Sequence, residues 1–291
     1  MLIALAAIWG ASFMFIKVAV EELAPGEVVF GRVLVGTLAL LPAVPFMIGW
    51  RRLFTELRRY AWPLLVLALF NASIPFWLLA WSEKRLDSGL AAVLQASTPL
   101  FTAVLAFGFS RSDRIGGVRL VGVVVGFLGV VLLVGAQPSG DVLSALAVLL
   151  TASCYAAAAL YAGRRLAGAP PILTSFGTLA IATLTTIPFG ITQLPDHMPS
   201  WKAIGSVIAL GSLGLSVAYL LYFGLIAGAG ASYAVLVTYL VPALALGYGA
   251  VFLGEHISAS AIGGLVLILA GVALGTGTFR LSRGAPVGET P

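Results

Sequence analysis

Residues 120–136 read LVGVVVGFLGVVLLVGA, seventeen positions without a charged or hydrogen-bonding side chain. At ~1.5 Å per residue, a helix of about twenty such residues crosses a hydrocarbon core ~30 Å thick. Comparable stretches recur along the chain, and they are continuously apolar instead of alternating as transmembrane strands do. This stretch and its relatives therefore predict an all-α polytopic membrane protein.

The overall composition leads to the same prediction. Hydrophobic residues make up 60% of the 291 residues and charged residues 9%, with a mean hydropathy of +1.07, which excludes an ordinary soluble domain. At about 29 residues per span and connection, the length allows roughly ten transmembrane helices and no separate soluble domain. The apolar windows place them near residues 1–20, 27–49, 61–81, 89–109, 117–136, 142–162, 172–193, 201–222, 231–253 and 259–279.

The basic residues predict the orientation of these spans. The 16 Lys and Arg residues lie almost wholly at span ends, a pattern of membrane topology that argues against nucleic acid as a partner. Eleven of them follow even-numbered spans, so the positive-inside rule makes both termini cytoplasmic. We expect a multi-pass protein of the plasma membrane, the inner membrane of a bacterium. The eleven residues are Arg51, Arg52, Arg58, Arg59, Arg111, Arg114, Arg119, Arg164, Arg165, Arg280 and Arg283.

A weak internal repeat divides the chain into two halves. Residues at offsets of 142 to 143 match in the same order in both halves, and five spans per half make the second half enter the membrane from the opposite side. The pattern predicts inverted repeats over 1–137 and 138–279, followed by a cytoplasmic tail over 280–291; secondary transporters with this design bind substrate near the midplane. The matches pair Ala91, Val93 and Pro99 with Ala234, Leu236 and Pro242, and Gly122, Gly129 and Val130 with Gly264, Gly271 and Val272.

Several short motifs resemble a known family. The run Trp9-Gly10-Ala11-Ser12-Phe13 with Lys17, then Arg32, and segments at Pro99 and Pro242 that end in an acidic turn resemble the drug/metabolite transporter superfamily, in particular its ten-helix EamA-type members. The resemblance covers nearly the whole chain. It implies two inverted five-helix repeats, a cavity lined mainly by spans one, three, four, six, eight and nine, and export of amino acids or related metabolites. The chain differs at its start, where we expect the usual polar leader to be short or missing.

Other kinds of chemistry find little support. Both histidines and all eleven carboxylates fall in connections or at span ends, so no catalytic residue, metal site or cofactor is predicted, and an intramembrane enzyme is a remote alternative. None of the three lysines follows a glycine, which excludes a Walker A loop in this chain. Without an acid at mid-depth, the carrier either runs down the gradient of its substrate or couples protons through span-end groups such as Glu255.

Two cations lie within apolar runs. Lys17 and Arg32 are both near Glu21, Glu22 and Glu27 in the sequence. They form an outer gate or a carboxylate-binding site, or they extend to the outer head groups and form local ion pairs there. The second interpretation is favoured because both side chains are within reach of the interface.

Polar and aromatic residues at depth mark a candidate cavity where they share a helical face. Asn71 and Gln95 carry most weight, because an unpaired amide in hydrocarbon costs several kcal/mol and needs a polar neighbour or a wet cavity. For a single Ser or Thr the competing interpretation is a bond within its own helix, and for a terminal Trp a place in the interfacial belt. The predicted cavity residues are Trp9, Ser12, Asn71, Trp77, Trp81, Gln95, Thr98, Tyr155, Ser216, Tyr219, Thr238 and Tyr239.

Two prolines at corresponding positions predict helix breaks. Pro99 and Pro242 each displace the carbonyl four residues earlier, that of Gln95 or Thr238, which a wet cavity can accommodate. The breaks then mark a midplane site and take part in gating, or they are kinks that serve packing only, which we weigh equally.

The function predicted from these features is secondary transport. The cavity is expected to have aromatic walls, neutral polar groups and no fixed charge, which suits a neutral, zwitterionic or soft cationic substrate. We predict an exporter of amino acids or related small metabolites, with aromatic amino acids among the candidates, that works by alternating access. The alternative is a multidrug or quaternary organic-cation exporter. The expected partners are a small-molecule substrate and the lipid bilayer, while the substrate, the coupling ion, the direction of net transport and the oligomeric state stay open.

Overall fold

A computed structural model describes residues 1–109, 117–135, 141–193, 195, 197–234 and 236–275. The predicted tail over 280–291 and the basic residues Arg111, Arg114, Arg280 and Arg283 lie outside the described residues. Within them the chain is helical, as predicted, with two π-helical segments, η1 and η2. The first half contains α1 (Leu2–Val20), α2 (Pro25–Leu40), α3 (Ala43–Met47), α4 (Trp50–Arg59), α5 (Ala61–Ala68), η1 (Leu69–Ser73), α6 (Ile74–Glu83), α7 (Ser88–Gln95), α8 (Thr98–Phe109) and α9 (Val118–Gly135).

The described part of the second half is helical too. It contains α10 (Val142–Arg165), α11 (Pro171–Thr192), α12 (Trp201–Gly211), η2 (Ser212–Val217), α13 (Ala218–Ala229), α14 (Ala231–Ala234), α15 (Val237–Phe252) and α16 (Ala259–Gly275). The two π-helical segments begin at Leu69 and Ser212, 143 residues apart, which is one of the two offsets found in the sequence.

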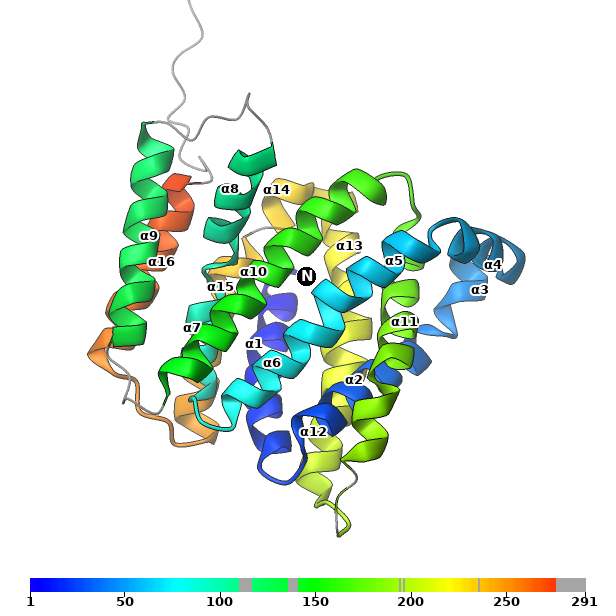
Figure 1. The fold of residues 1–291 in the computed structure, drawn as a ribbon, viewed down its shortest axis with the longest axis horizontal. Helices are drawn as coiled ribbons and strands as arrows, with labels where there is room; N and C mark the ends of the chain where they lie inside the picture. Colours follow the sequence, from blue (N-terminus) through cyan, green and yellow to red (C-terminus); the bar gives the residue numbers. More distant parts are fainter. Residues whose placement is uncertain (110–116, 136–140, 194, 196, 235, 276–291) are drawn as a thin grey trace, which may run out of the picture.

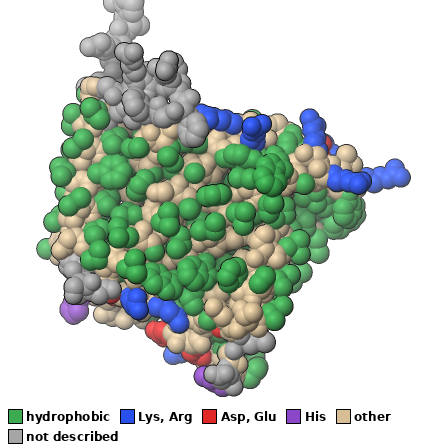
Figure 2. All heavy atoms as spheres, viewed as in Figure 1, with side chains coloured by type: hydrophobic (Ala, Val, Ile, Leu, Met, Phe, Trp, Pro, Cys, Tyr) green, Lys and Arg blue, Asp and Glu red, His purple; other side chains and the backbone are tan. Residues whose placement is uncertain are grey.

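By length and composition, six described segments can cross a membrane: Leu2–Val20, Ala61–Glu83, Ser88–Ala106, Val142–Arg165, Pro171–Thr192 and Trp201–Ile226. Three shorter apolar helices accompany them, at Leu120–Gly135, Val237–Phe252 and Ala259–Gly275. On the face that Figure 2 shows, hydrophobic side chains cover the broad middle and charged side chains gather at the two ends. The chain is therefore a multi-pass membrane protein.

Local signals explain where several helices begin. Proline occupies the first turn of α2 and of α11, where its missing N–H costs no helical hydrogen bond. The Glu27 carboxylate folds back to accept a hydrogen bond from the backbone N–H of Ala24 (2.7 Å), just before α2. The hydroxyl of Ser200 caps α12 by accepting from the N–H of Ala203 (3.3 Å).

The segment expected as a single span over 27–49 is shorter than predicted. Its first helix, α2, ends at Leu40. Pro42 lies between α2 and the short α3, and Pro45 lies within α3. Proline cannot donate the backbone hydrogen bond that a continuing helix needs. The connection that follows is itself a helix, α4, which the sequence prediction missed.

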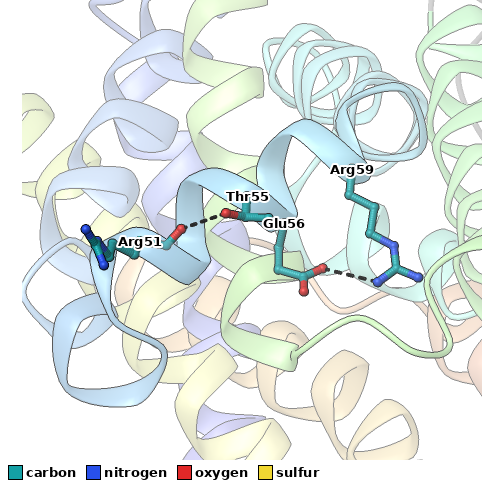
Figure 3. Close-up of polar contacts among 4 residues, drawn as sticks. All are labelled: Arg51, Thr55, Glu56 and Arg59. Carbon is teal, nitrogen blue, oxygen red and sulfur yellow. Dashed lines mark hydrogen bonds and ion pairs between the residues drawn. The ribbon is translucent and has the colours of Figure 1, made fainter.

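Helix α4 is amphipathic and lies at one edge of the molecule (Figure 1). Its Leu53 is buried and its Phe54 is exposed, while arginines flank both. The Thr55 hydroxyl donates to the carbonyl of Arg51 (3.0 Å), and Arg59 Nη1 lies 4.0 Å from Glu56 Oε2 (Figure 3). A basic helix with exposed aromatic residues suits the membrane interface.

Helices from the two halves pack against one another. The closest pair, α9 and α16, stands at the edge opposite α4 (Figure 1). Further pairs are α2 with α11, α1 with α15, and α6 with α10. Several contacts occur in pairs that would be equivalent in a repeat of five spans: α1 with α15 and α10 with α7 and α8, α1 with α12 and α10 with α5, and α1 with α13 and α10 with α6.

Candidate binding cavity

A central cavity of about 1040 Å³ lies between the two halves of the chain. Its wall is formed by residues of α1, α2, α5, α6, α7, α8, α10, α11, α13, α14, α15 and α16 and of both π-helical segments. Eleven residues singled out in the sequence line it: Trp9, Ser12, Arg32, Asn71, Gln95, Thr98, Pro99, Tyr155, Tyr219, Thr238 and Pro242.

The π-helical segment η2 helps to fix Trp9 in this wall. The indole Nε1 of Trp9 donates to the carbonyl of Gly214 (3.2 Å), within η2. A π-helical turn bonds i to i+5, so it disturbs the regular i to i+4 ladder and leaves backbone acceptors available to side chains. The bond joins the first and second halves of the chain at the cavity. Asn71, in η1, lines the same cavity and interacts with the hydroxyl of Tyr219.

Arg32 brings a fixed positive charge into the cavity. Its side chain is 5% exposed, and its guanidinium carbon lies 3.9 Å from the centroid of the Phe76 ring. Tyr155 and Tyr219 are close enough to interact with it electrostatically. Its Nε is buried without a hydrogen-bond partner, and no carboxylate among the described residues lies within 4.0 Å of its nitrogens.

Two expectations about Arg32 are therefore wrong: the cavity does carry a fixed charge, and the guanidinium does not extend to the outer head groups. The reason lies in the register of α2. Val28, Arg32 and Gly36, spaced by four, form a buried face of this helix. The nearby acids have other partners, because Glu27 bonds to Ala24 and Glu22 bonds to Ser200.

Lys17 occupies a different place from Arg32. Its Nζ donates to the backbone carbonyls of Glu83 and Leu86, both at 2.8 Å, where α6 ends. The two cations, expected together in one outer site, are thus separated: Arg32 lines the cavity, while Lys17 helps to close the end of the bundle beyond it. Neither forms the expected ion pairs with Glu21, Glu22 or Glu27 in the described part of the chain.

Four predicted cavity residues lie outside the cavity wall. Trp77 and Trp81 stack on each other, with ring centroids 6.5 Å apart, and Tyr239 packs against the hydrophobic core. Ser216 donates to the carbonyl of Gly36 (2.9 Å) and so joins η2 to α2. Their absence from the wall corrects the sequence prediction.

The register of η1 explains why Trp77 and Trp81 lie outside the cavity wall. The prediction assumed a regular helix, in which Trp77 and Trp81 lie on the face toward the cavity. The extra residue in the π-helical turn rotates everything after it, so Phe76 and Leu79 face the cavity instead. Ser73 bonds to Thr185 on α11 (2.8 Å).

The two prolines line the cavity but act differently. Near Pro99 the chain does break: α7 ends at Gln95, α8 begins at Thr98, and the Thr98 hydroxyl donates to the displaced carbonyl of Gln95 (2.8 Å). Pro242 lies inside the continuous helix α15, so the predicted break at that position is wrong. A proline within a helix removes one hydrogen bond, and the helix can continue with a bend.

Sequence reasoning missed other parts of the wall. Phe76, on α6, was not identified because the π-helical turn hid its register. Ser175 and Thr178 on α11 also line the cavity, and the Thr178 hydroxyl is buried without a partner. Ser175 and Thr178 are three residues apart and so share a helical face. The same spacing identified cavity residues on other helices, but α11 was not searched for it.

The end of the bundle beyond Lys17 is closed by polar contacts between the halves. The Glu255 carboxylate accepts from the N–H of Ser88 (2.7 Å), the hydroxyl of Ser88 (3.0 Å) and the N–H of Gly89 (3.1 Å). Glu22 accepts from the N–H of Ser200 (2.6 Å) and from its hydroxyl. We call these two carboxylates and their partners the polar seal. Toward the opposite end the cavity extends to Ala106 and Ala162.

A helical membrane bundle built around a central cavity with polar groups from many helices is the architecture of a membrane transporter. The model of the EamA-like transporter family matches residues 1–135 and again residues 142–276. The chain belongs to this family.

Related proteins are similar over nearly their whole length. An uncharacterized transporter of Archaeoglobus fulgidus is 27% identical, over 91% of this chain and 93% of its own. The inner membrane transporter YedA of Escherichia coli K12 is 28% identical, over 96% and 91%. A probable amino-acid metabolite efflux pump of Salmonella typhimurium is 26% identical, over 96% and 95%. A solved crystal structure superposes with a TM-score of 0.65 at 19% identity over 94% of each chain, which supports the fold alone.

Proposed function

We propose that this protein is a secondary carrier of the bacterial inner membrane that exports amino acids or related small metabolites by alternating access. The observation that carries the proposal is the single guanidinium, Arg32, held in an otherwise neutral polar and aromatic cavity. The names of two relatives, an inner membrane transporter and a probable amino-acid metabolite efflux pump, support the location and the substrate class.

Arg32 favours a substrate with a carboxylate. A buried charge without a counter-ion is costly, and a carboxylate that enters the cavity would supply two parallel hydrogen bonds to the guanidinium. The Phe76 ring already covers one face of Arg32, which leaves its N–H edge for an anion.

The remaining wall suits the rest of an amino acid. Asn71 and Gln95 offer amide oxygens for an ammonium group, and the Gln95 Oε1 is buried without a partner. Trp9, Tyr155 and Tyr219 provide aromatic surface for a side chain, which keeps aromatic amino acids among the candidates. Thr98 and Thr238 complete the proposed binding residues, together with Ser12.

The competing substrate class fits the same wall less well. A quaternary organic cation would gain cation–π contacts with the aromatic residues, but it would be repelled by Arg32 in a medium of low dielectric constant.

The proposed topology is ten spans in two inverted repeats, with both termini in the cytoplasm. Three observations support it: the family model matches twice in succession, the π-helical segments are 143 residues apart, and contacts between helices recur when the halves are exchanged. On this topology the polar seal faces outward, and the structure represents the state closed to the outside.

Labelling with an impermeant maleimide tests this topology in a Cys154→Ser background. Met198→Cys, an exposed position before α12, should react from outside in intact cells. Ala167→Cys, between α10 and α11, should react only after permeabilisation. The reverse pattern would overturn the orientation.

Counterflow in proteoliposomes tests the function. Purified protein should exchange labelled neutral amino acids faster than empty liposomes, without ATP, and should prefer tryptophan to tryptamine, which lacks the carboxylate. Arg32→Gln should weaken apparent affinity for the amino acid by roughly 10- to 100-fold, the size expected for a charge-assisted hydrogen bond, and abolish that preference. Arg85→Gln, an exposed arginine near Trp81, is the control and should change neither. If organic cations exchange and amino acids do not, the alternative class is correct.

A further inference from the structure

Glu83, the last residue of α6, is a buried acid that the proposed substrate site does not use. Its side chain is fully buried, and neither carboxylate oxygen has a hydrogen-bond partner in the described structure. The sequence predicted all carboxylates in connections or at span ends, and Glu83 does lie at the end of a span. Its complete burial was not predicted.

Three charged groups from other parts of the chain act on Glu83 but do not pair with it. Lys17 on α1 and Arg32 on α2 attract its negative charge, and Glu255 before α16 repels it. Lys17 donates to two backbone carbonyls instead of the carboxylate, as described above. Asp87 before α7 and Asp141 before α10 are acidic groups at the outer ends of the other helices packed on α6.

This arrangement favours the neutral acid while the outer end is closed. Burial removes the water that would stabilise a carboxylate, and no N–H or O–H donor of the described residues replaces it. A protonated carboxyl is far less costly in the same place. The effect of burial is weaker at Asp87, which lies at the rim. Burial raises the pKa of Asp87, and the charge of Glu255 raises it further.

We propose that Glu83 is a proton-binding site linked to closure of the outer end. The inference rests on the alternating-access function proposed above. When the seal opens, Glu255 leaves Ser88 and Gly89, water reaches Glu83, and the carboxyl releases its proton to that water. When the seal closes, the carboxylate takes one proton back from the outer solution before it is buried.

The sign of the pH dependence follows from this linkage. The closed state binds one proton more than the open state, so acid favours closure and rising pH favours opening. The ratio of open to closed protein should rise by up to about tenfold per pH unit over the range in which Glu83 is ionised in the open state and protonated in the closed state.

Accessibility of Leu79 from outside measures this ratio. Leu79 lines the cavity one turn before Glu83 and is buried, so a cysteine there should meet an impermeant outer reagent only when the seal opens. In a Cys154→Ser background, the labelling rate of Leu79→Cys is measured between roughly pH 5 and pH 9. Dividing it by the rate at Met198→Cys, an exposed outer position, removes the pH dependence of the thiol itself.

The normalised rate should rise with pH in the parent protein and stay low and flat when Glu83→Gln is added. Glu83→Asp keeps a titratable group and should keep a pH-dependent rate, which guards against a folding defect of the glutamine variant. Glu21→Gln, an exposed acid of the outer turn, is the matched control and should behave as the parent. A flat rate in the parent, or an unchanged slope in Glu83→Gln, overturns the proton site.

Counterflow on the same preparations separates this inference from the function on which it rests. If amino acids exchange but labelling does not depend on pH, only the proton site is wrong. If labelling follows Glu83 as expected but no substrate on the panel exchanges, the carrier assignment fails and the proton-linked closure stands.

Discussion

Helices α9 and α16 differ in almost every respect from the helices around the cavity. The pair at the edge is built mostly from Gly, Val, Leu and Ala and has no π-helical turn in its described residues. The two helices approach so closely that a Cβ on Gly271 would lie 2.4 Å from the Cα of Gly126. The central helices carry the π-helical segments, the prolines, the amides and the buried cation. The comparison indicates that the edge pair packs closely through regular helices, while the centre contains the π-helical turns, the prolines and the polar side chains of the cavity.

The largest expected effect comes from breaking the glycine contact. Gly271→Leu should destabilise the protein by about 3 kcal/mol, because the added side chain meets the backbone of α9 at Gly122 and Gly126 and cannot be accommodated by a side-chain shift. Thermal unfolding can be followed through a thiol-reactive dye, since Cys154 is buried in the folded protein. Gly263→Ala, on the same helix, is the control, because its Cβ would meet only Leu132 Cδ2 at an ordinary 3.5 Å. Equal stability of the two variants would contradict the packing role.

The next effect concerns the cavity, where a substitution should change substrate affinity and leave thermal stability nearly unchanged. Gln95→Leu removes a buried amide from the cavity wall and should change apparent substrate affinity by about tenfold, the worth of roughly one hydrogen bond, with little loss of thermal stability. Thr238→Val should show the same behaviour to a smaller degree. Ser153→Ala, whose hydroxyl bonds only within α10, should leave affinity unchanged. If both cavity variants transport with normal affinity and selectivity, the midplane site is misplaced.

A smaller effect is expected where the two regions meet. Glu255 lies between α15 and α16 and accepts three hydrogen bonds at the start of α7. Glu255→Gln keeps the shape but weakens these bonds, so the outer labelling rate of Leu79→Cys should rise several-fold at every pH while its slope with pH remains. A rate equal to that of the parent would show that the seal does not depend on the charge of Glu255.

The smallest effect concerns Glu22, at the exposed rim. The hydroxyl of Ser200, and then its backbone N–H, hold the pKa of Glu22 below its usual value of 4.5. A lowered pKa in the folded state means that the contact stabilises the protein above pH 4.5 and that this contribution is lost as pH falls below it. On acidification through this range, the melting temperature of the parent should therefore fall slightly more than that of Glu22→Gln. An identical fall in both would contradict the contribution of this contact.

The sequence was sufficient for the features that depend on composition and local spacing. Long apolar runs predicted the helical membrane fold, and the amides Asn71 and Gln95 were placed in a cavity because hydrocarbon cannot satisfy them. Both do line the cavity. The binding role of these residues stays a prediction until transport is measured.

The predictions that failed concern features that depend on how one helix is rotated against another. A regular helix was assumed through residues 69–73, so the face of Trp77 and Trp81 was assigned to the cavity in place of Phe76. The inward direction of Arg32 could not be read from its distance to the interface, because that distance allows both directions. The burial of Glu83 depends on contacts across the bundle, which no local pattern contains.

The matched π-helical segments also bear on the history of the chain. A π-helical turn holds one residue more than the same turn of an α-helix, so each segment can be viewed as a one-residue insertion that the surrounding helix absorbed. Segments that begin at Leu69 and Ser212 occupy the same position in the two halves. If the halves descend from one ancestral five-helix unit, the insertion was already present before the gene doubled, and it has been inherited twice.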